Sequence, residues 1–221
     1  MLYTITQPSA TPINLPSLKV GTNMLRRIES SGRISHRSEE KQTPDTWERF
    51  IRSVVLGHGD WSITEHVSVV VDVVCDRAIQ QEWTRHRLGA YTVESTRFVN
   101  YNKEGQELRL IAPPFNTEES RYTWNRAMCV AIEIYKKLIV SGCPPEIARS
   151  VLPLSLASNM RVTYNLRNWR HFFLMRTTKE THPQMRQITI PLLLTFKERI
   201  PLLFDDIEPG ARQSDNLMKG R

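Results

Sequence analysis

"EHVSVVVDVVCD", residues 65–76, is the stretch that decides the fold class. Valines occupy every second position from 67 to 73, and Ser68 and Asp72 lie between them. This alternation has the two-residue period of a β-strand with one buried face. The sequence therefore predicts a half-buried strand near the middle of the chain.

Helical patterns lie on both sides of this strand. Residues 22–40 begin as a helix that we expect to break at Gly32, and a second helix should follow the N-cap Thr43 and end near Gly57. Asp76, at the end of the strand, is a good N-cap residue and should begin a third helix. The strand is thus bracketed by helices.

The C-terminal half repeats this mixture. The strongest helix covers 118–142, and a strand at 159–165 is followed by helices at 167–177 and 182–204. On the first of these helices we expect one buried face, formed by Ala127, Ala131, Ile134 and Leu138.

Strands and helices do not alternate as regular βαβ units, which favours an α+β fold with a central sheet of few strands flanked by helices. A chain of 221 residues is long enough for one domain. We expect an irregular N-terminal arm at 1–20, one domain at 21–208 and a polar tail at 209–221.

Composition restricts the partners. The formal net charge of +7 and a pI near 9.5 favour anionic ligands. Three widely spaced cysteines suggest reduced thiols rather than a disulfide framework. No apolar run resembles a signal peptide or a membrane span, so we expect a soluble, cytoplasmic protein without membrane contact.

"RHRLGAYTVESTRFVNY", residues 85–101, concentrates positive charge. A solvated basic turn and a pocket for an anion both explain such a stretch. Two further polar clusters occur, in "GHGDWSITEH" at 57–66 and in the block from 146 to 184. Taken singly, His171 beside Phe172 is typical of a satisfied core histidine, and Arg170 of a solvated arginine. Together, several arginines without matching acids are best tolerated when bound anions neutralise them.

Other kinds of site have weaker support. The histidines lack the spacing of a zinc site, so we expect no metal. No glycine-rich dinucleotide motif is present, so any dinucleotide must be held by side chains. A nucleic-acid-binding module remains an alternative, because arginines and aromatic residues are mixed in a basic chain.

"RHRLGAYTVESTR" resembles the signature of the flavin-dependent thymidylate synthases: Arg-His-Arg, seven residues, Ser, one residue, Arg. "GRISHRSEE", "GHGDWSITEH" and the segments "ARSVLPLSL", "YNLRNWRHFFLMR" and "HPQ" resemble further blocks of that family, in order, over roughly residues 24–207. The resemblance implies that the chain methylates dUMP reductively to dTMP and binds no nucleic acid. FAD, 5,10-methylenetetrahydrofolate and NADPH would take part, within a homotetramer whose sites are shared between subunits.

The resemblance also implies site residues. The FAD contacts would be Ser35, Ser62, Glu65, Arg85, His86, Arg87, Leu88, Asn165, Arg167, His171 and His182. The dUMP contacts would be Arg85, Glu94, Ser95, Thr96, Arg97, Arg149 and Arg176, with Arg149 coming from a neighbouring subunit.

For catalysis we expect Arg176 to stabilise charge on the pyrimidine. Ser95 is expected to donate a hydrogen bond rather than act as a nucleophile, and His58 should lie near flavin and folate. Val93, Glu82, Ala90 and Phe98 depart from residues common in the family. Val93 in particular leaves a flavoprotein without synthase activity as a second alternative.

Overall fold

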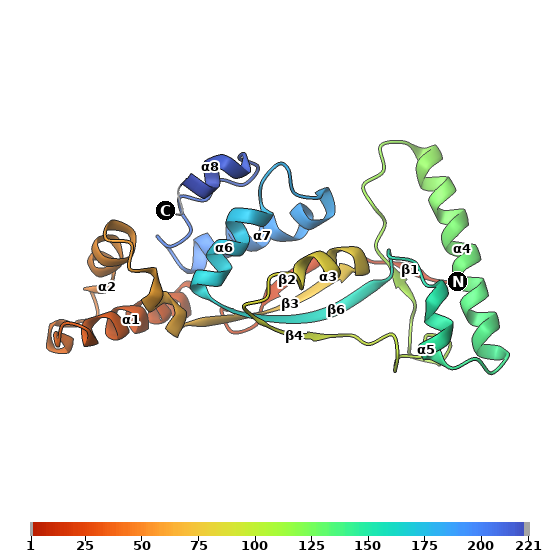
Figure 1. Cartoon of the computed structure of the whole chain (residues 1–221), viewed down its shortest axis with the longest axis horizontal. Helices are drawn as coiled ribbons and strands as arrows, with labels where there is room; N and C mark the ends of the chain where they lie inside the picture. Colours follow the sequence, from red (N-terminus) through yellow and green to blue (C-terminus); the bar gives the residue numbers. More distant parts are fainter. Residues whose placement is uncertain (1, 219–221) are drawn as a thin grey trace. The chain divides into compact units, whose positions relative to one another are not determined.

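The computed structural model describes residues 2–218 and has a mixed α and β fold in which helices flank small sheets, as predicted (Figure 1). Its packing also divides the chain into two compact units, which length and composition did not indicate. The first unit contains the residues up to Ser9 together with 73–85 and 92–160, and the second contains 10–72, 86–91 and the residues from Arg161 onward.

The predicted strands are present. In β3 (Ser68–Asp76) the alternate valines are buried, and β6 (Ala157–Asn165) alternates in the same way over most of its length. Together with β2 (Ser9–Pro12) and β4 (Ala90–Val93) they form a four-stranded sheet in the order β2-β3-β6-β4. The period-two pattern of the valines was therefore a reliable indication.

The N-terminal segment differs from the irregular arm that its prolines predicted. β1 (Thr4–Ile5) pairs in parallel with β5 (Arg109–Leu110), and the Thr4 amide donates to the Leu108 carbonyl at 3.0 Å. β2 is an edge strand, a position that tolerates proline. The tail also contains a short helix, α8 (Gln213–Met218), and residues 219–221 lie outside the described part.

The second unit contains α1 (Leu18–Ile34), which runs past Gly32 instead of breaking there. A Cβ at Gly32 would lie 2.6 Å from the Phe50 ring, so this glycine permits close packing within a continuous helix. The next helix begins later than predicted, as α2 (Trp47–Phe50), and continues as the π-helix η2 (Ile51–Gly57).

The remaining helical elements of this unit are η1 (Glu39–Lys41), η3 (Trp61–His66), α6 (Leu166–Arg176) and α7 (Pro183–Arg199). Their core is aromatic. Trp169 stacks on Phe173 with a centroid distance of 5.6 Å, and its indole nitrogen donates to the Val69 carbonyl of β3 at 3.0 Å. This hydrogen bond satisfies a polar atom that burial would otherwise penalise. It also fixes the start of α6 against the sheet.

The first unit contains α3 (Arg77–Trp83), α4 (Glu118–Val140), α5 (Pro145–Ala148) and η4 (Arg149–Val151). Asp76 caps α3 as predicted, because its carboxylate accepts from the Ile79 amide at 2.8 Å.

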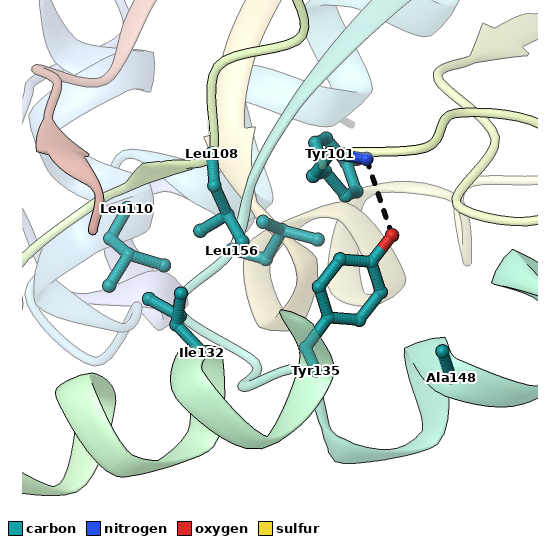
Figure 2. Packing of buried hydrophobic residues seen from close by; sticks show 7 residues of the cluster. All are labelled: Tyr101, Leu108, Leu110, Ile132, Tyr135, Ala148 and Leu156. Atoms are coloured by element: carbon teal, nitrogen blue, oxygen red, sulfur yellow. Dashed lines mark hydrogen bonds between the residues drawn. The ribbon is translucent and has the colours of Figure 1, made fainter. Parts of the chain in front are cut away.

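The face of α4 that packs against its own unit is not the one predicted. Ile132 and Tyr135 point toward Leu110, Leu156 and Tyr101 (Figure 2). In contrast, Ala127 and Ile134 of the predicted face are exposed, whereas Ala131 and Leu138 are half-buried. The buried face is rotated relative to the predicted one, so Ala127 and Ile134 point outward while Leu138 still packs beside the core.

Candidate functional site

A pocket of about 460 Å³ lies in the second unit, where η3, the loop after His86 and the first turns of α6 meet. Its volume falls within the roughly 300–1,000 Å³ typical of small-molecule sites. Trp61, Leu88 and Leu174 supply an apolar wall, and charged or polar side chains supply the rest. The polar lining is Glu65, Arg167, Asn168, Arg170 and His171.

The start of α6 determines how this lining is presented. The Asn165 side chain caps the helix by accepting from the Asn168 amide at 2.9 Å. Arg167 and His171 are four residues apart, so they lie on one face of the helix. Asn168 then donates to the carbonyl of Leu88 at 2.8 Å, which fixes the loop after His86 against the helix.

Arg167 forms an exposed ion pair with Glu65, with Nη1 2.6 Å from Oε1. Exposed pairs of this kind contribute about 0–1 kcal/mol, so an anionic ligand can replace the carboxylate at small cost. The pocket therefore combines a cation that can change partner with an apolar wall.

Two interpretations of single residues were wrong. Arg170, expected in solvent, is 4% exposed; it donates to both carboxylate oxygens of Asp206 and lies 4.4 Å from the Trp61 ring centroid. His171, read as a core residue, is exposed at the pocket. The spacing of Leu166, Trp169 and Phe173 places Arg170 on the buried side of the helix, and that phase was the signal available in the sequence.

His86 and Arg176 are directly bonded. The Arg176 Nε–H donates to Nε2 of His86 at 2.8 Å, and the imidazole lies edge-on to Phe172 with centroids 4.9 Å apart. Burial of the ring, followed by the positive charge of Arg176 and the nearby His171, lowers the pKa of His86 from 6.5 to about 4. The ring is neutral at pH 7, with its proton on Nδ1, because Nε2 must accept.

The His86 loop is also supported from behind. The Tyr91 hydroxyl donates to the His86 carbonyl and contacts the Tyr164 hydroxyl. Gly89 passes so close to this tyrosine that a Cβ there would lie 2.1 Å from the Tyr164 ring. The ring centroid of His171, which lines the pocket, is 6.2 Å from that of His86. The bonded pair of His86 and Arg176 therefore lies next to the pocket lining.

The other FAD and catalytic residues expected in this unit do not line the pocket. Ser35 ends α1 and donates to the Gly32 carbonyl at 2.8 Å, and His182 caps α7 by accepting from the Gln184 amide at 3.2 Å. Ser62 shares η3 with Trp61 and Glu65, and Arg87 lies in the loop between His86 and Leu88. His58 is exposed directly after the π-helix.

The first unit holds all the expected dUMP residues except Arg176, and three of them, Thr96, Arg97 and Arg149, form one cluster. Arg149 Nη1 donates to the Thr96 hydroxyl at 3.3 Å, and Arg97 Nε donates to the Glu146 carboxylate at 3.0 Å. Arg149 Nε also donates to the backbone carbonyl of Glu146 at 3.2 Å. Glu146, which sequence reasoning missed, therefore links both arginines. Arg85, exposed after α3, belongs to the same unit.

Glu94 and Ser95 precede this cluster and organise its backbone. The Glu94 carboxylate accepts from the Asn159 side chain at 2.6 Å and from the Tyr101 hydroxyl at 2.7 Å. The Ser95 hydroxyl accepts from the Arg97 amide at 3.3 Å. Asn159 and Tyr101 are thus further supporting residues that the motif did not reveal.

The donor set fits FAD. A flavin needs an apolar surface for its rings, and its pyrophosphate needs cations or N–H donors. Trp61, Leu88 and Leu174 provide the first, and Arg167 and His171 provide the second. Within residues 2–218, no group of three or more His, Cys, Asp or Glu side chains could hold a metal ion. Of the helices in that range, none is long and apolar enough to cross a membrane.

The family described as "Thymidylate synthase complementing protein" matches residues 18–202, which include the pocket and the arginine cluster. The chain belongs to this family. The Pyrococcus furiosus flavin-dependent thymidylate synthase is 30% identical over 184 residues, covering 82% of this chain and 70% of that protein. The Saccharolobus solfataricus enzyme of the same name is 31% identical over 182 residues, covering 82% and 69%.

Solved structures agree on the fold. The UMP/dUMP methylase PolB from Streptomyces cacaoi, in a crystal structure bound with 5-Br dUMP, superimposes with a TM-score of 0.75 at 21% identity. The match covers 91% of this chain and 95% of PolB. At this identity the likeness establishes the fold and leaves the ligand to be argued from the site.

Proposed function

We propose that the chain is a flavin-dependent thymidylate synthase that methylates dUMP reductively to dTMP. Membership of the family and relatives at about 30% identity under that name support this function. The observation that carries it in the structure is Arg176 held by a neutral histidine next to a pocket suited to a flavin.

Arg176 has the properties that the reaction demands. Transfer of a one-carbon unit to carbon 5 of uracil requires electron density at that carbon, and the enolate-like form that supplies it carries negative charge on a carbonyl oxygen of the pyrimidine. A guanidinium fixed in advance stabilises such charge without reorganising. Its Nε–H is bonded to the imidazole of His86, which gives the Arg176 guanidinium a defined orientation.

The Arg97 and Arg149 cluster suits the nucleotide phosphate. Guanidinium groups bind phosphate oxygens through paired, charge-assisted hydrogen bonds. In this structure Glu146 occupies that role for Arg97, and the Thr96 hydroxyl is beside Arg149. Phosphate would displace the exposed Glu146 carboxylate and gain hydrogen bonds from Arg97, Arg149 and Thr96. Ser95 and Glu94 would complete this wall.

FAD, when bound, supplies the redox chemistry of the methylation. Arg167, His171, His86 and Asn165 would hold and orient it, and His58 would lie toward flavin and folate. We propose 5,10-methylenetetrahydrofolate as the carbon donor and NADPH as the reductant, in a cytoplasmic enzyme of nucleotide biosynthesis.

The assembly we propose is a homotetramer with active sites shared between subunits. We expected Arg149 to come from a neighbouring subunit, and Arg149 is bonded to Thr96 of its own chain. We therefore propose that Thr96 and Arg97 enter the neighbour's site together with Arg149. Arg176 would serve the nucleotide bound by a neighbour's cluster.

The test begins with visible absorbance during titration with FAD. We expect a flavin spectrum and saturable binding, followed by dTMP formation when dUMP, methylenetetrahydrofolate and NADPH are added. UMP should be assayed in parallel, because PolB is named a UMP/dUMP methylase. A protein that ignores FAD would contradict the proposal. A yellow protein that forms no dTMP would instead be a flavoprotein without synthase activity.

A matched control separates the site from general charge. Arg161→Ala removes an exposed arginine, paired with Asp72, that we place outside the site. It should keep FAD binding and turnover near the unmodified values, whereas Arg167→Ala should weaken FAD binding. Equal losses in both variants would show that overall charge, and not the pocket, determines affinity.

A further inference from the structure

The outward face of α4 carries an apolar stripe. Val130 is 56% exposed and Ile134 is 42% exposed, and Ala127 lies between them and the N-terminal part of the helix. A shallow groove of about 560 Å³ runs along this stripe. Large apolar side chains in a row along a helix are normally covered.

The opposite face of α4 is already occupied. Ile132 and Tyr135 are buried against Leu110, Leu156 and Tyr101, and the Tyr135 hydroxyl accepts from the Tyr101 amide at 3.2 Å (Figure 2). The helix therefore cannot rotate to bury its stripe within its own unit. A second surface is needed to cover Ala127, Val130 and Ile134.

Charges beside the stripe indicate what that surface is. Arg126 and Glu133 are seven residues apart, so they lie on the same flank of the helix, next to the stripe. When two identical helices pack antiparallel, residues on this flank meet the same flank of the other copy in reverse order. Arg126 then lies opposite Glu133 of the partner subunit, and Glu133 lies opposite Arg126 of the partner subunit. The stripe is self-complementary in this orientation.

We propose that α4 packs antiparallel against α4 of a second copy of this chain, through the stripe at Ala127, Val130 and Ile134. Val130 meets Ala127 of the partner subunit, and the small side chains allow close approach of the two helices. The contact is isologous, as a two-fold axis requires.

Existing interactions do not oppose this pairing. Glu133 is bonded to Lys137 at 2.7 Å within one helix, and Arg126 lies 6.0 Å from the Tyr122 ring. Both Glu133 and Arg126 are exposed, so water screens these interactions and the side chains can turn to a new partner. One such interface accounts for a dimer, and it would be one of the contacts in the homotetramer proposed above. Its existence does not depend on thymidylate synthesis.

Charge reversal tests the orientation. Association is measured by sedimentation over a range of protein concentrations, without substrates or FAD. Arg126→Glu and Glu133→Arg should each weaken association by about tenfold or more, because each places like charges opposite one another twice. The double variant Arg126→Glu with Glu133→Arg should restore association to near the original value. Double variants as weak as the single ones, or single variants without effect, would overturn the antiparallel pairing.

Two further variants cover the stripe and the controls. Val130→Glu with Ile134→Glu should give a smaller species of unchanged helicity, measured by circular dichroism, since both positions are exposed in the single chain. Lys136→Glu changes charge away from the stripe, toward residues 101–108, and should leave association unchanged. An unaltered oligomer in the double glutamate variant would show that α4 is not the interface. Because dTMP formation is assayed separately, this failure is distinguishable from failure of the proposed function.

Discussion

The arginines of the two units are held in opposite ways. In the first unit, Arg97 is bonded to the charged carboxylate of Glu146, and both side chains are exposed. In the second unit, Arg176 is bonded to a half-buried, neutral imidazole, His86. The exposed Glu146 carboxylate compensates the charge of Arg97, whereas the imidazole of His86 orients Arg176.

We propose that this difference separates substrate capture from catalysis. An exposed arginine that exchanges a carboxylate for a phosphate gains little specificity for the transition state, so it acts mainly on substrate affinity. An arginine fixed by a neutral acceptor can stabilise charge that develops only during reaction. We therefore propose that the same residue type performs two tasks, and the predictions below test that distinction.

The largest effect is expected from Arg176→Ala. Loss of a preorganised electrostatic donor should lower kcat by about 10²- to 10³-fold. Thermal unfolding and FAD titration should show that the variant still folds and binds flavin. If kcat is unchanged, Arg176 has no role in stabilising the pyrimidine, and the contrast between the two units fails.

Mixing variants tests whether the two arginine sites come from different subunits. With dUMP well below the KM of the unmodified enzyme, Arg149→Ala and Arg176→Ala enzymes should each be nearly inactive, and subunit exchange should restore about a quarter of the activity by random assortment. Exchange is verified by mass spectrometry before the assay.

A pair within one cluster is the matched control. Arg149→Ala with Arg97→Ala should give no recovery, because both residues belong to the same cluster in the same chain. Recovery in this second mixture would separate Arg97 from Arg149. Verified mixed oligomers of the first pair that remain inactive would place Arg149 and Arg176 in a site from one subunit.

Arg97→Ala should act on affinity. Hydrogen bonds to charged groups contribute about 1.5–3 kcal/mol, so KM for dUMP should rise by roughly 10- to 150-fold. kcat should change far less, as expected for binding that is equal in ground and transition states. Steady-state kinetics over a range of dUMP concentrations measure both constants. A loss confined to kcat would give Arg97 the task we assign to Arg176.

The lowered pKa of His86 predicts that the stability of the folded protein depends on pH. Its folded-state pKa, about 4, lies below the ordinary value of 6.5, so the neutral ring is the stable form in the folded protein. Between these values the unfolded chain binds the extra proton, and the contribution of His86 to stability, complete above pH 6.5, is lost as pH falls toward 4.

A His86→Phe variant keeps an aromatic ring against Phe172 and removes the titration. The difference in urea midpoint between the two proteins should therefore shift in favour of the variant as pH falls from 6.5 to 4. His171 and Arg176 face His86 and remain in both proteins, so their contributions largely cancel. A difference that does not vary with pH would contradict the lowered pKa.

The smallest effect is expected at Cys143. This residue is half-buried beside the core of the first unit, and the proposed mechanism uses no thiol. Cys143→Ala should leave kcat within about twofold, as substitutions outside functional features usually do. Turnover under saturating substrates is the measurement. A large loss with the fold intact would instead indicate a cysteine nucleophile.

Local sequence patterns predicted the helices and strands more accurately than the contacts that these elements make. The valines of β3 and the cap at Asp76 were predicted because strand period and capping depend on adjacent residues. The outward face of α4 was misassigned, because the apolar pattern on this helix does not specify whether the partner lies in the same chain. The periodicity indicated that one face of the helix is apolar, but it did not indicate which surface covers that face.

The site showed the same limit. Family resemblance brought Thr96, Arg97 and Arg149 together, but Glu146 is 49 positions from Arg97 and has no local signature. Asp206 is likewise 36 positions from Arg170. Acids that neutralise arginines through the tertiary fold are invisible to sequence spacing, so the cluster appeared less compensated than it is.

Gly89 limits how the loop after His86 can be redesigned. Replacing a loop glycine with alanine is a common way to stiffen a protein, but here the added methyl group would occupy the volume of the Tyr164 ring. The side chains allowed at positions 89 and 164 therefore depend on each other for steric reasons. Alanine at 89 should be accepted only when the residue at 164 is made smaller, and a library that varies position 89 alone will find only glycine.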